Sequence, residues 1–297
     1  MVNDLVSFKT MSKDDIMRLT GQEDDAGGSG SVLIPRLAIN RAGEDDDGNK
    51  LESGTYAIYD PESEKKVYSK KGEVVKLRPF IRAYQYMDYN QKENKYTNKT
   101  IIFKSWKDEA LDSNGGVKCG KIPFKELNSV SKEEALRQKD IKCYTLLYGL
   151  LNMNAVTGEG ESTVLKDLPV LWRVTGTNFR PVNEVVKSIK NRNKLIQNVN
   201  LLLGTKRKKT GNNVYYISDI GIDDAEVEFT KDNFETMQMF SQIIKDENIE
   251  VIESWKSAQG NSEGGGNPET ISGTSEVVEA VETAPKTEET PEQVLAT

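Results

Sequence analysis

Alternating apolar and polar positions dominate the chain from Val32 to Ile222. Because successive side chains of a β-strand point to opposite faces, this period-two pattern predicts a mainly β domain with one buried face per strand. Residues typical of turns, such as Asp60 and Pro61, separate the runs. The expected strands are Leu33–Ile39, Thr55–Tyr59, Lys66–Ser69, Val74–Met87, Lys99–Trp106, Ile141–Asn152, Val170–Thr175, Leu195–Leu203 and Val214–Ile222.

Two segments carry apolar residues at helical spacing instead. Pro181 favours the first turn of a helix whose apolar face holds Val182, Val185, Val186 and Ile189. Thr230 is a candidate N-cap for a second helix that reaches about Lys245. Its expected buried stripe comprises Phe234, Met237, Phe240 and Ile244.

The two ends of the chain differ in composition from the middle. Residues 1–30 read as a flexible arm with a possible short helix, and residues 259–297 are rich in Gly, Ser, Thr, Pro and Glu and lack aromatic residues. Such a tail buries too little apolar surface to offset the entropy of ordering, so we expect it to be disordered. The expected folded domain covers residues 31–258. No leader peptide and no membrane-spanning stretch is recognisable, which favours a cytoplasmic protein.

Charge is segregated along the chain. Residues 31–219 carry 33 Lys and Arg against 23 Asp and Glu, whereas residues 220–297 carry 4 against 18. The net charge of −7 therefore hides a basic body that could attract a polyanion, with acidic flanks that would compete for the same surface. The alternative is that each block only reflects its solvated faces.

Several catalytic and metal-binding classes find no support. The chain has no histidine and two cysteines, which removes His-dependent triads and the commonest transition-metal ligand. Gly115–Lys121 matches part of a P-loop, but Ile122 stands where Ser or Thr must hold magnesium, so we interpret it as a glycine-rich turn. Asp45–Asp47 lacks the spacing of a calcium loop. We therefore expect a binding protein rather than an enzyme, with no cofactor and no metal.

The segment 78–86 carries the most informative pattern. Alternation places arginines and aromatic rings on one face of the expected strand and Pro79, Ile81, Ala83 and Gln85 on the other. Guanidinium groups neutralise phosphates while aromatic rings stack on bases, as single-stranded nucleic acid requires. The predicted binding face comprises Arg78, Phe80, Arg82, Tyr84 and Tyr86. The alternative is that these rings face a second sheet and the arginines pair with acids.

Other residues could extend this surface. Thr205–Asn213 is expected to be a basic loop between two strands, suited to contacts with a nucleic-acid backbone or simply solvated. Additional candidates lie on neighbouring strands and in the loop before Pro181. The full set of additional nucleic-acid-binding candidates is Lys104, Trp106, Tyr144, Phe179, Arg180, Lys206, Arg207, Lys208 and Lys209.

A basic β-rich body, a strand rich in arginine and aromatic residues, and an acidic C-terminal tail together resemble a single-stranded-DNA-binding protein of tailed bacteriophages. The segments Leu33–Leu37, Arg78–Phe80, Gly115–Lys121 and Trp172–Pro181 also resemble blocks of uncharacterised phage proteins. The resemblance implies an elaborated OB-like barrel. It also implies binding and protection of single-stranded DNA during replication or recombination, with replication or recombination proteins as partners of the tail. Tails of this family commonly end in a phenylalanine-bearing tip, whereas this chain ends Val294–Thr297.

Two other classes remain open from the sequence. The protein could be a virion or scaffold component that packs against copies of itself, or a transcription or replication adaptor that offers its ends as peptide ligands.

Overall fold

A computed structural model describes residues 34–44, 48–60, 66–90, 93–105, 107–225 and 227–262. The expected N-terminal arm and most of the expected C-terminal tail lie outside these residues. The fold is mainly β, with a mixed nine-stranded sheet and few helices, as the alternation predicted. Within the described residues, none of the helices has the length and apolar character needed to cross a membrane.

Five strands form a closed ring. They are β1 (Arg36–Ile39), β2 (Tyr56–Tyr59), β3 (Lys66–Ser69), β6 (Ile141–Thr157) and β7 (Ser162–Val174). Each pairs with the next in the order β1–β2–β3–β6–β7, and β7 returns to β1 as the one parallel pair of this ring. The ring closes because the long strand β6 pairs with β3 only at its C-terminal end.

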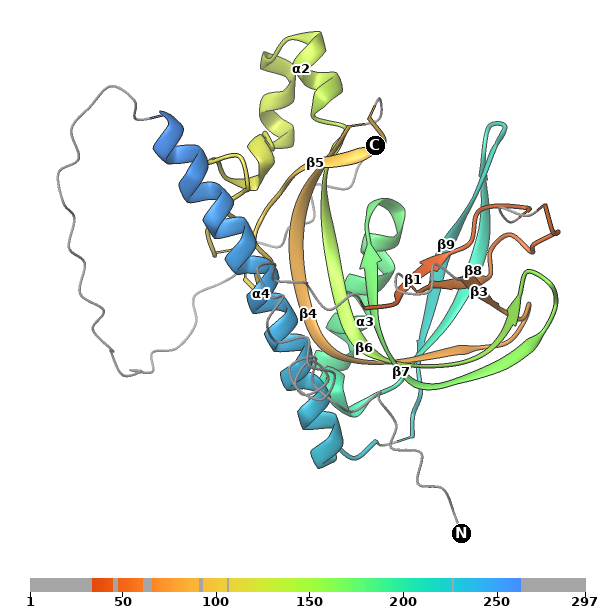
Figure 1. Ribbon diagram of the computed structural model, residues 1–297. Helices are drawn as coiled ribbons and strands as arrows, with labels where there is room; N and C mark the ends of the chain where they lie inside the picture. Colours follow the sequence, from red (N-terminus) through yellow and green to blue (C-terminus); the bar gives the residue numbers. More distant parts are fainter. Residues whose placement is uncertain are drawn as a thin grey trace, which may run out of the picture.

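The N-terminal half of β6 carries the rest of the sheet. There it pairs with β4 (Val75–Asn90), and β4 in turn pairs with β5 (Lys95–Lys99) and β8 (Leu201–Thr210). The last strand, β9 (Asn213–Ile222), pairs with β8 and with no other strand of the described residues. The sheet therefore continues from the ring into a two-stranded β8–β9 hairpin, which projects past the other strands in Figure 1.

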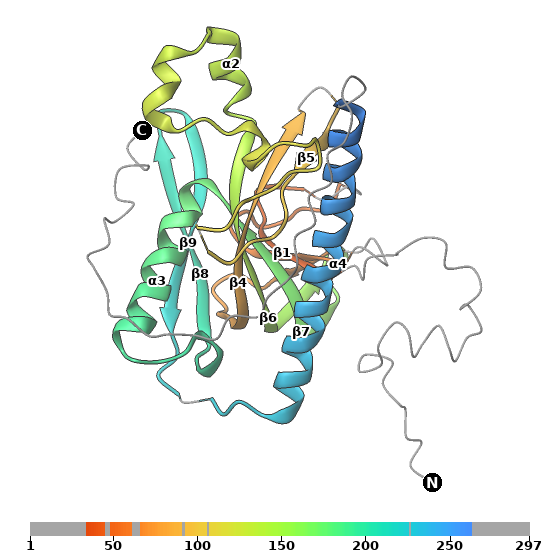
Figure 2. The same cartoon turned by 90° about the vertical axis from the view of Figure 1, so that its left-hand side faces the viewer.

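Two long helices cover opposite faces of this sheet, as Figure 2 shows. On one face, α3 (Phe179–Asn191) places Val182, Val185 and Ile189 in the larger hydrophobic core. On the other, α4 (Lys231–Ser262) places Phe240, Ile243 and Ile244 in a second core against β4, β6 and β7. The short helix α2 (Lys132–Arg137) belongs to an excursion between β5 and β6 and is capped by the side chain of Ser131.

Several expected boundaries are wrong. Helix α3 begins at Phe179 rather than Pro181, and α4 extends to Ser262 rather than Lys245. Phe234, expected in the buried stripe of α4, is 47% exposed. Only Leu201–Leu203 of the expected strand Leu195–Leu203 belongs to a paired strand, because a 3-10 turn occupies Ile196–Asn198. The expected basic loop from Thr205 is instead part of two paired strands.

Candidate nucleic-acid interface

A β-bulge divides the predicted binding face on β4. The register between β4 and β6 shifts between Pro79 and Ile81, so Phe80 is an extra residue in the ladder. Pro79 has no N–H to donate to the ladder. Its partner on β6 is Gly149, where a Cβ would collide with the Arg78 backbone, so the glycine allows β4 to approach β6 closely. As a result Phe80 joins Ile81 in the core beneath α4, although alternation assigned them to opposite faces.

Arg78 and Phe80 are structural residues beneath α4, which corrects the prediction that they bind nucleic acid from an open face. The Arg78 guanidinium donates to the Gln197 carbonyl at 2.8 Å, to Asn233 Oδ1 at 2.8 Å and to the Glu228 carbonyl at 2.7 Å. Burial lowers the pKa of Arg78. Phe80 is 1% exposed and its ring packs against those of Phe229 and Phe240.

The other three predicted residues of this strand point to the opposite face, where they too are packed. Tyr84 is 7% exposed, with Phe103 at 5.8 Å between ring centroids. The Arg82 guanidinium lies 5.1 Å from the Tyr84 ring centroid and donates to Asn183 on α3. Tyr86 is half-buried and stacks on Phe103 at 6.0 Å. The five residues therefore do not form one open platform.

The structure places the scattered candidates in separate environments. Tyr144 is half-buried, with its hydroxyl 3.4 Å from that of Tyr96. Phe179 is half-buried against the Tyr84–Phe103 cluster. Arg180 is exposed and pairs with Glu184 at 2.7 Å. Lys104 is exposed, and Trp106 lies outside the described residues.

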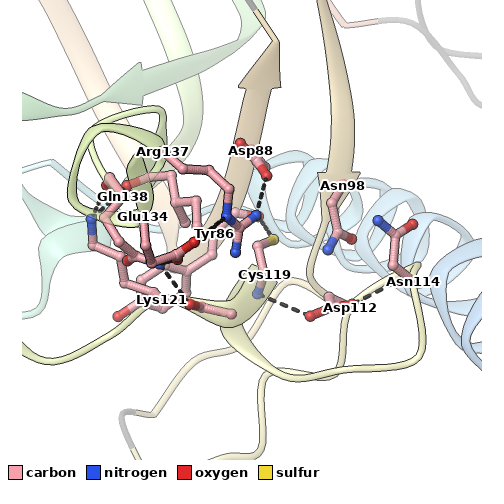
Figure 3. Close-up of polar contacts among 12 residues, drawn as sticks. Tyr86, Asp88, Asn98, Asp112, Asn114, Cys119, Lys121, Glu134, Arg137 and Gln138 are labelled. Carbon is pink, nitrogen blue, oxygen red and sulfur yellow. Dashed lines mark hydrogen bonds and ion pairs between the residues drawn. The ribbon is translucent and has the colours of Figure 1, made fainter. Parts of the chain in front are cut away.

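The Gly115–Lys121 segment is a tight turn, as predicted, and Figure 3 shows how it is held. The carboxylate of Asp112 accepts hydrogen bonds from the backbone N–H groups of Asn114, Gly116 and Cys119. The Lys121 ammonium donates to the carbonyls of Gln138 and Ile141, which fastens the turn to the start of β6. Since its donors are turned inward, this loop does not cradle a phosphate.

Both cysteines are free thiols. Cys119 is buried and Cys143 is half-buried. Burial raises the pKa of the Cys143 thiol to about 12 and raises that of Cys119 further. Neither thiol is therefore a reactive thiolate at neutral pH.

The β8–β9 hairpin is where the structure brings exposed cations together with aromatic rings. Lys206, Arg207, Lys208 and Lys209 are all exposed on β8. In the antiparallel register Arg207 lies opposite Tyr216 and Lys208 opposite Tyr215. Because directly opposed residues share a face, each face of the hairpin carries a cation beside a tyrosine.

Hydrogen bonds fix the base of this hairpin to the ring. The Thr205 hydroxyl donates to the Gly54 carbonyl, and the Tyr56 hydroxyl contacts the Gly204 carbonyl and Ser218 Oγ, both at 3.2 Å. The Ser218 N–H donates to Asn178 Oδ1 at the start of α3. The hairpin thus leaves the ring in a defined direction (Figure 1).

Asp219 neutralises part of the positive charge of the hairpin. Asp219 pairs with Lys206 at 2.8 Å, and both side chains are at least half exposed. Among the described residues, Arg207, Lys208 and Lys209 have no ion-pair partner. Three cations are therefore available to an anionic ligand.

Tyr215 and Tyr216 were missed from the sequence. Treating Thr205–Asn213 as a loop left these tyrosines outside the expected site. The sequence did contain a signal for a hairpin. Gly211 and Asn212 form a two-residue turn between two runs of strand-like residues, and such a turn fixes the cross-strand register. Within the described residues, no cluster of three His, Cys, Asp or Glu residues could hold a metal ion.

Comparisons of this chain with protein-family models, with curated proteins and with solved structures gave no match.

Proposed function

We propose that the protein binds single-stranded DNA and that the β8–β9 hairpin is its main contact. The observation that carries the proposal is the cross-strand pairing of Arg207 with Tyr216 and of Lys208 with Tyr215 on a firmly rooted hairpin. The two cations are exposed and both tyrosines are half-buried, with the Tyr216 ring also packed against Gly54. The β4 strand was expected to supply this combination of charge and flat rings, but Phe80 and Tyr84 are buried and Tyr86 is half-buried.

The hairpin offers the two interactions that single strands require. Lys and Arg side chains neutralise phosphates and release counterions, which makes binding depend steeply on salt. A base stacked on a tyrosine contributes about 1–3 kcal/mol, irrespective of its identity. Both interactions tolerate any sequence, so the hairpin would bind without strong sequence preference.

The proposed activity is binding without chemistry. The role that fits it is protection of single-stranded DNA during replication or recombination in the cytoplasm. The acidic residues after α4 would then recruit replication or recombination proteins. This extended role rests on the family resemblance of the sequence together with the hairpin.

Fluorescence anisotropy with a labelled oligo-dT at about 50 mM salt tests the proposal. Replacing Arg207, Lys208 and Lys209 by Gln should weaken binding at least ~10-fold. It should also reduce the slope of log K against log salt by about 2, since each phosphate contact contributes about 0.7 for single strands. Replacing the exposed Lys231, Lys245 and Lys256 of α4 by Gln is the charge-matched control and should have little effect.

Competition with a duplex separates single-strand binding from general attraction to polyanions. A two-stranded β-ribbon can also enter the major groove of DNA, so equal affinity for duplex and single strand would contradict the proposed preference. Absence of oligo-dT binding at low salt, by the full chain and by a chain ending at Ser262, would contradict the function itself.

A further inference from the structure

A second group of arginines and tyrosines lies on the α4 side of the sheet. Arg36 on β1 is opposite Tyr59 on β2 and opposite Leu171 on β7, so these three side chains share a face. Arg173 is two residues beyond Leu171 and therefore shares that face as well. Leu171 itself belongs to the core beneath α4, which identifies the face.

The same face continues across β6 to the β4–β5 pair. Arg173 is opposite Leu146, and Tyr144 lies two residues before Leu146. The Tyr144 hydroxyl is 3.4 Å from the hydroxyl of Tyr96, whose ring packs edge-on against Tyr89 at 5.1 Å. We define the Arg36–Arg173 row as the side chains of Tyr59, Arg36, Arg173, Tyr144 and Tyr96. Arg36 and Tyr96 are exposed, and the other three are half-buried.

The two arginines of the row lie close enough to repel each other. Burial and then the neighbouring Arg173 lower the pKa of Arg36, while Tyr96, Glu247 and Tyr59 act in the opposite direction. Glu247, from α4, is the acid that faces them, but it already accepts a hydrogen bond from Gln85 at 3.0 Å and pairs with Lys99 at 3.6 Å. Among the described residues, no carboxylate forms an ion pair with Arg36 or Arg173.

Unsatisfied donors accompany these two arginines. The Nε of Arg173 and the hydroxyl of Tyr148 are both buried and have no hydrogen-bond partner in the described part of the chain. A buried donor without an acceptor is destabilising, and two adjacent guanidinium groups without an ion-paired carboxylate add to that cost. An oxyanion between the arginines would relieve the repulsion and supply acceptors, since guanidinium groups bind phosphate in a bidentate manner.

We infer that the Arg36–Arg173 row is a second contact site for the single strand, in which the arginines bind a phosphate and Tyr96 stacks on a base. This inference rests on the proposed function, because the ligand is the strand that the hairpin binds. It extends the interface from the hairpin to the outer face of the ring beside α4. A strand long enough to reach both sites would therefore bind more tightly than one that occupies a single site.

The test compares oligo-dT of about 8 and about 30 nucleotides, which brackets the usual site size of such proteins. Replacing both Arg36 and Arg173 by Gln should weaken binding of the longer strand ~10-fold and reduce its salt slope by about 1.4. Tyr96→Ala should weaken it at least ~5-fold, whereas Tyr96→Phe, which keeps the ring, should retain most of the affinity. Lys190→Gln with Arg192→Gln, at the C-terminal end of α3, is the charge-matched control and should leave binding unchanged.

The outcomes separate this inference from the proposed function. If the hairpin variant weakens binding and the Arg36–Arg173 variant does not, the second site is refuted while the function stands. If the full chain binds neither strand, both fail. The alternative is that the arginines form ion pairs with carboxylates of the chain itself. In the sequence, the nearest acids before β1 are Glu23, Asp24 and Asp25. Neutralising these three would then lower the melting temperature as much as losing the arginines does, with no change in DNA affinity in either variant, and this result would also refute the site.

Discussion

The ring of Tyr216 on β9 lies directly against Gly54, the residue that leads into β2, so closely that a Cβ at position 54 would overlap it. Gly54 also has a φ of +86°, which side-chain-bearing residues rarely adopt. The root of the basic hairpin is thus fitted to a glycine of the ring, and the Thr205 hydroxyl bonds the carbonyl of the same residue.

Gly54→Ala should destabilise the fold by about 1–2 kcal/mol, because it combines an unfavourable φ with a steric overlap. The overlap is absent in Tyr216→Ala, so the same glycine replacement should be less costly in that background. Urea unfolding of the four proteins of this double-mutant cycle measures the difference. An equal effect of Gly54→Ala in both backgrounds would show that the contact with Tyr216 contributes nothing.

Asp219→Asn should strengthen binding of single-stranded DNA about 3-fold and steepen its salt dependence by about 0.7. Asp219 is the acid that pairs with Lys206 at the hairpin, so neutralising it frees a fourth cation for phosphate. Stability should change by less than about 1 kcal/mol, since exposed ion pairs contribute little. Asp224→Asn, which removes the ion pair with Arg192 just after α3, is the control and should leave affinity unchanged. Weaker binding by Asp219→Asn would argue that the hairpin does not meet phosphates.

Much of the fold followed from the spacing of apolar residues alone. The structure confirms the mainly β class, most strand positions and the buried α3 face containing Val182, Val185 and Ile189. These predictions hold because each apolar pattern extends over several residues or turns that bury the same face. Alternation also separated Ile81 and Ala83 from Arg82 and Tyr84 correctly, since β4 is regular after the bulge.

The expected open face of β4 is not formed, because a local β-bulge interrupts the alternation. A single extra residue at Phe80 moves Arg78 and Phe80 to the α4 side, and the sequence signals this only through Pro79 and the distant Gly149. The rings then lie under α3 and α4, whose docking is a tertiary property. The basic run from Lys206 was visible in the sequence, but its tyrosine neighbours depend on cross-strand register, which composition does not reveal.

Phe80→Ala should destabilise the fold by about 3–5 kcal/mol, the usual range for removing a buried aromatic ring. The affinity of the molecules that remain folded for DNA should not change, because the ring is 1% exposed beneath α4. Chemical unfolding and anisotropy on the same preparation measure the two quantities separately. Phe124→Ala, at a 56% exposed ring, should alter stability by less than about 0.5 kcal/mol. Loss of affinity in a fully folded Phe80→Ala protein would return this residue to the binding site.

Tyr148→Phe should stabilise the protein at neutral pH by about 1 kcal/mol, because the hydroxyl is buried without a partner in the described residues. The ring, which packs on Phe240 at 5.6 Å, is retained in this variant. Tyr56→Phe is the contrasting variant, since the Tyr56 hydroxyl contacts both the Gly204 carbonyl and Ser218. Tyr56→Phe should lower the free energy of unfolding by about 1 kcal/mol.

Alkaline pH should affect these two variants in the same direction. Burial raises the pKa of both Tyr148 and Tyr56 well above the ordinary value of 10.0. The native state therefore keeps each phenol protonated, so its contribution is complete below pH 10 and is lost as pH rises from there toward the folded pKa. Each phenylalanine variant lacks one such group, and its stability should fall less between pH 9 and 11 than that of the parent protein. Urea midpoints across this range provide the measurement, and a parallel decline in all three proteins would show that neither tyrosine is shielded from solvent in the native state.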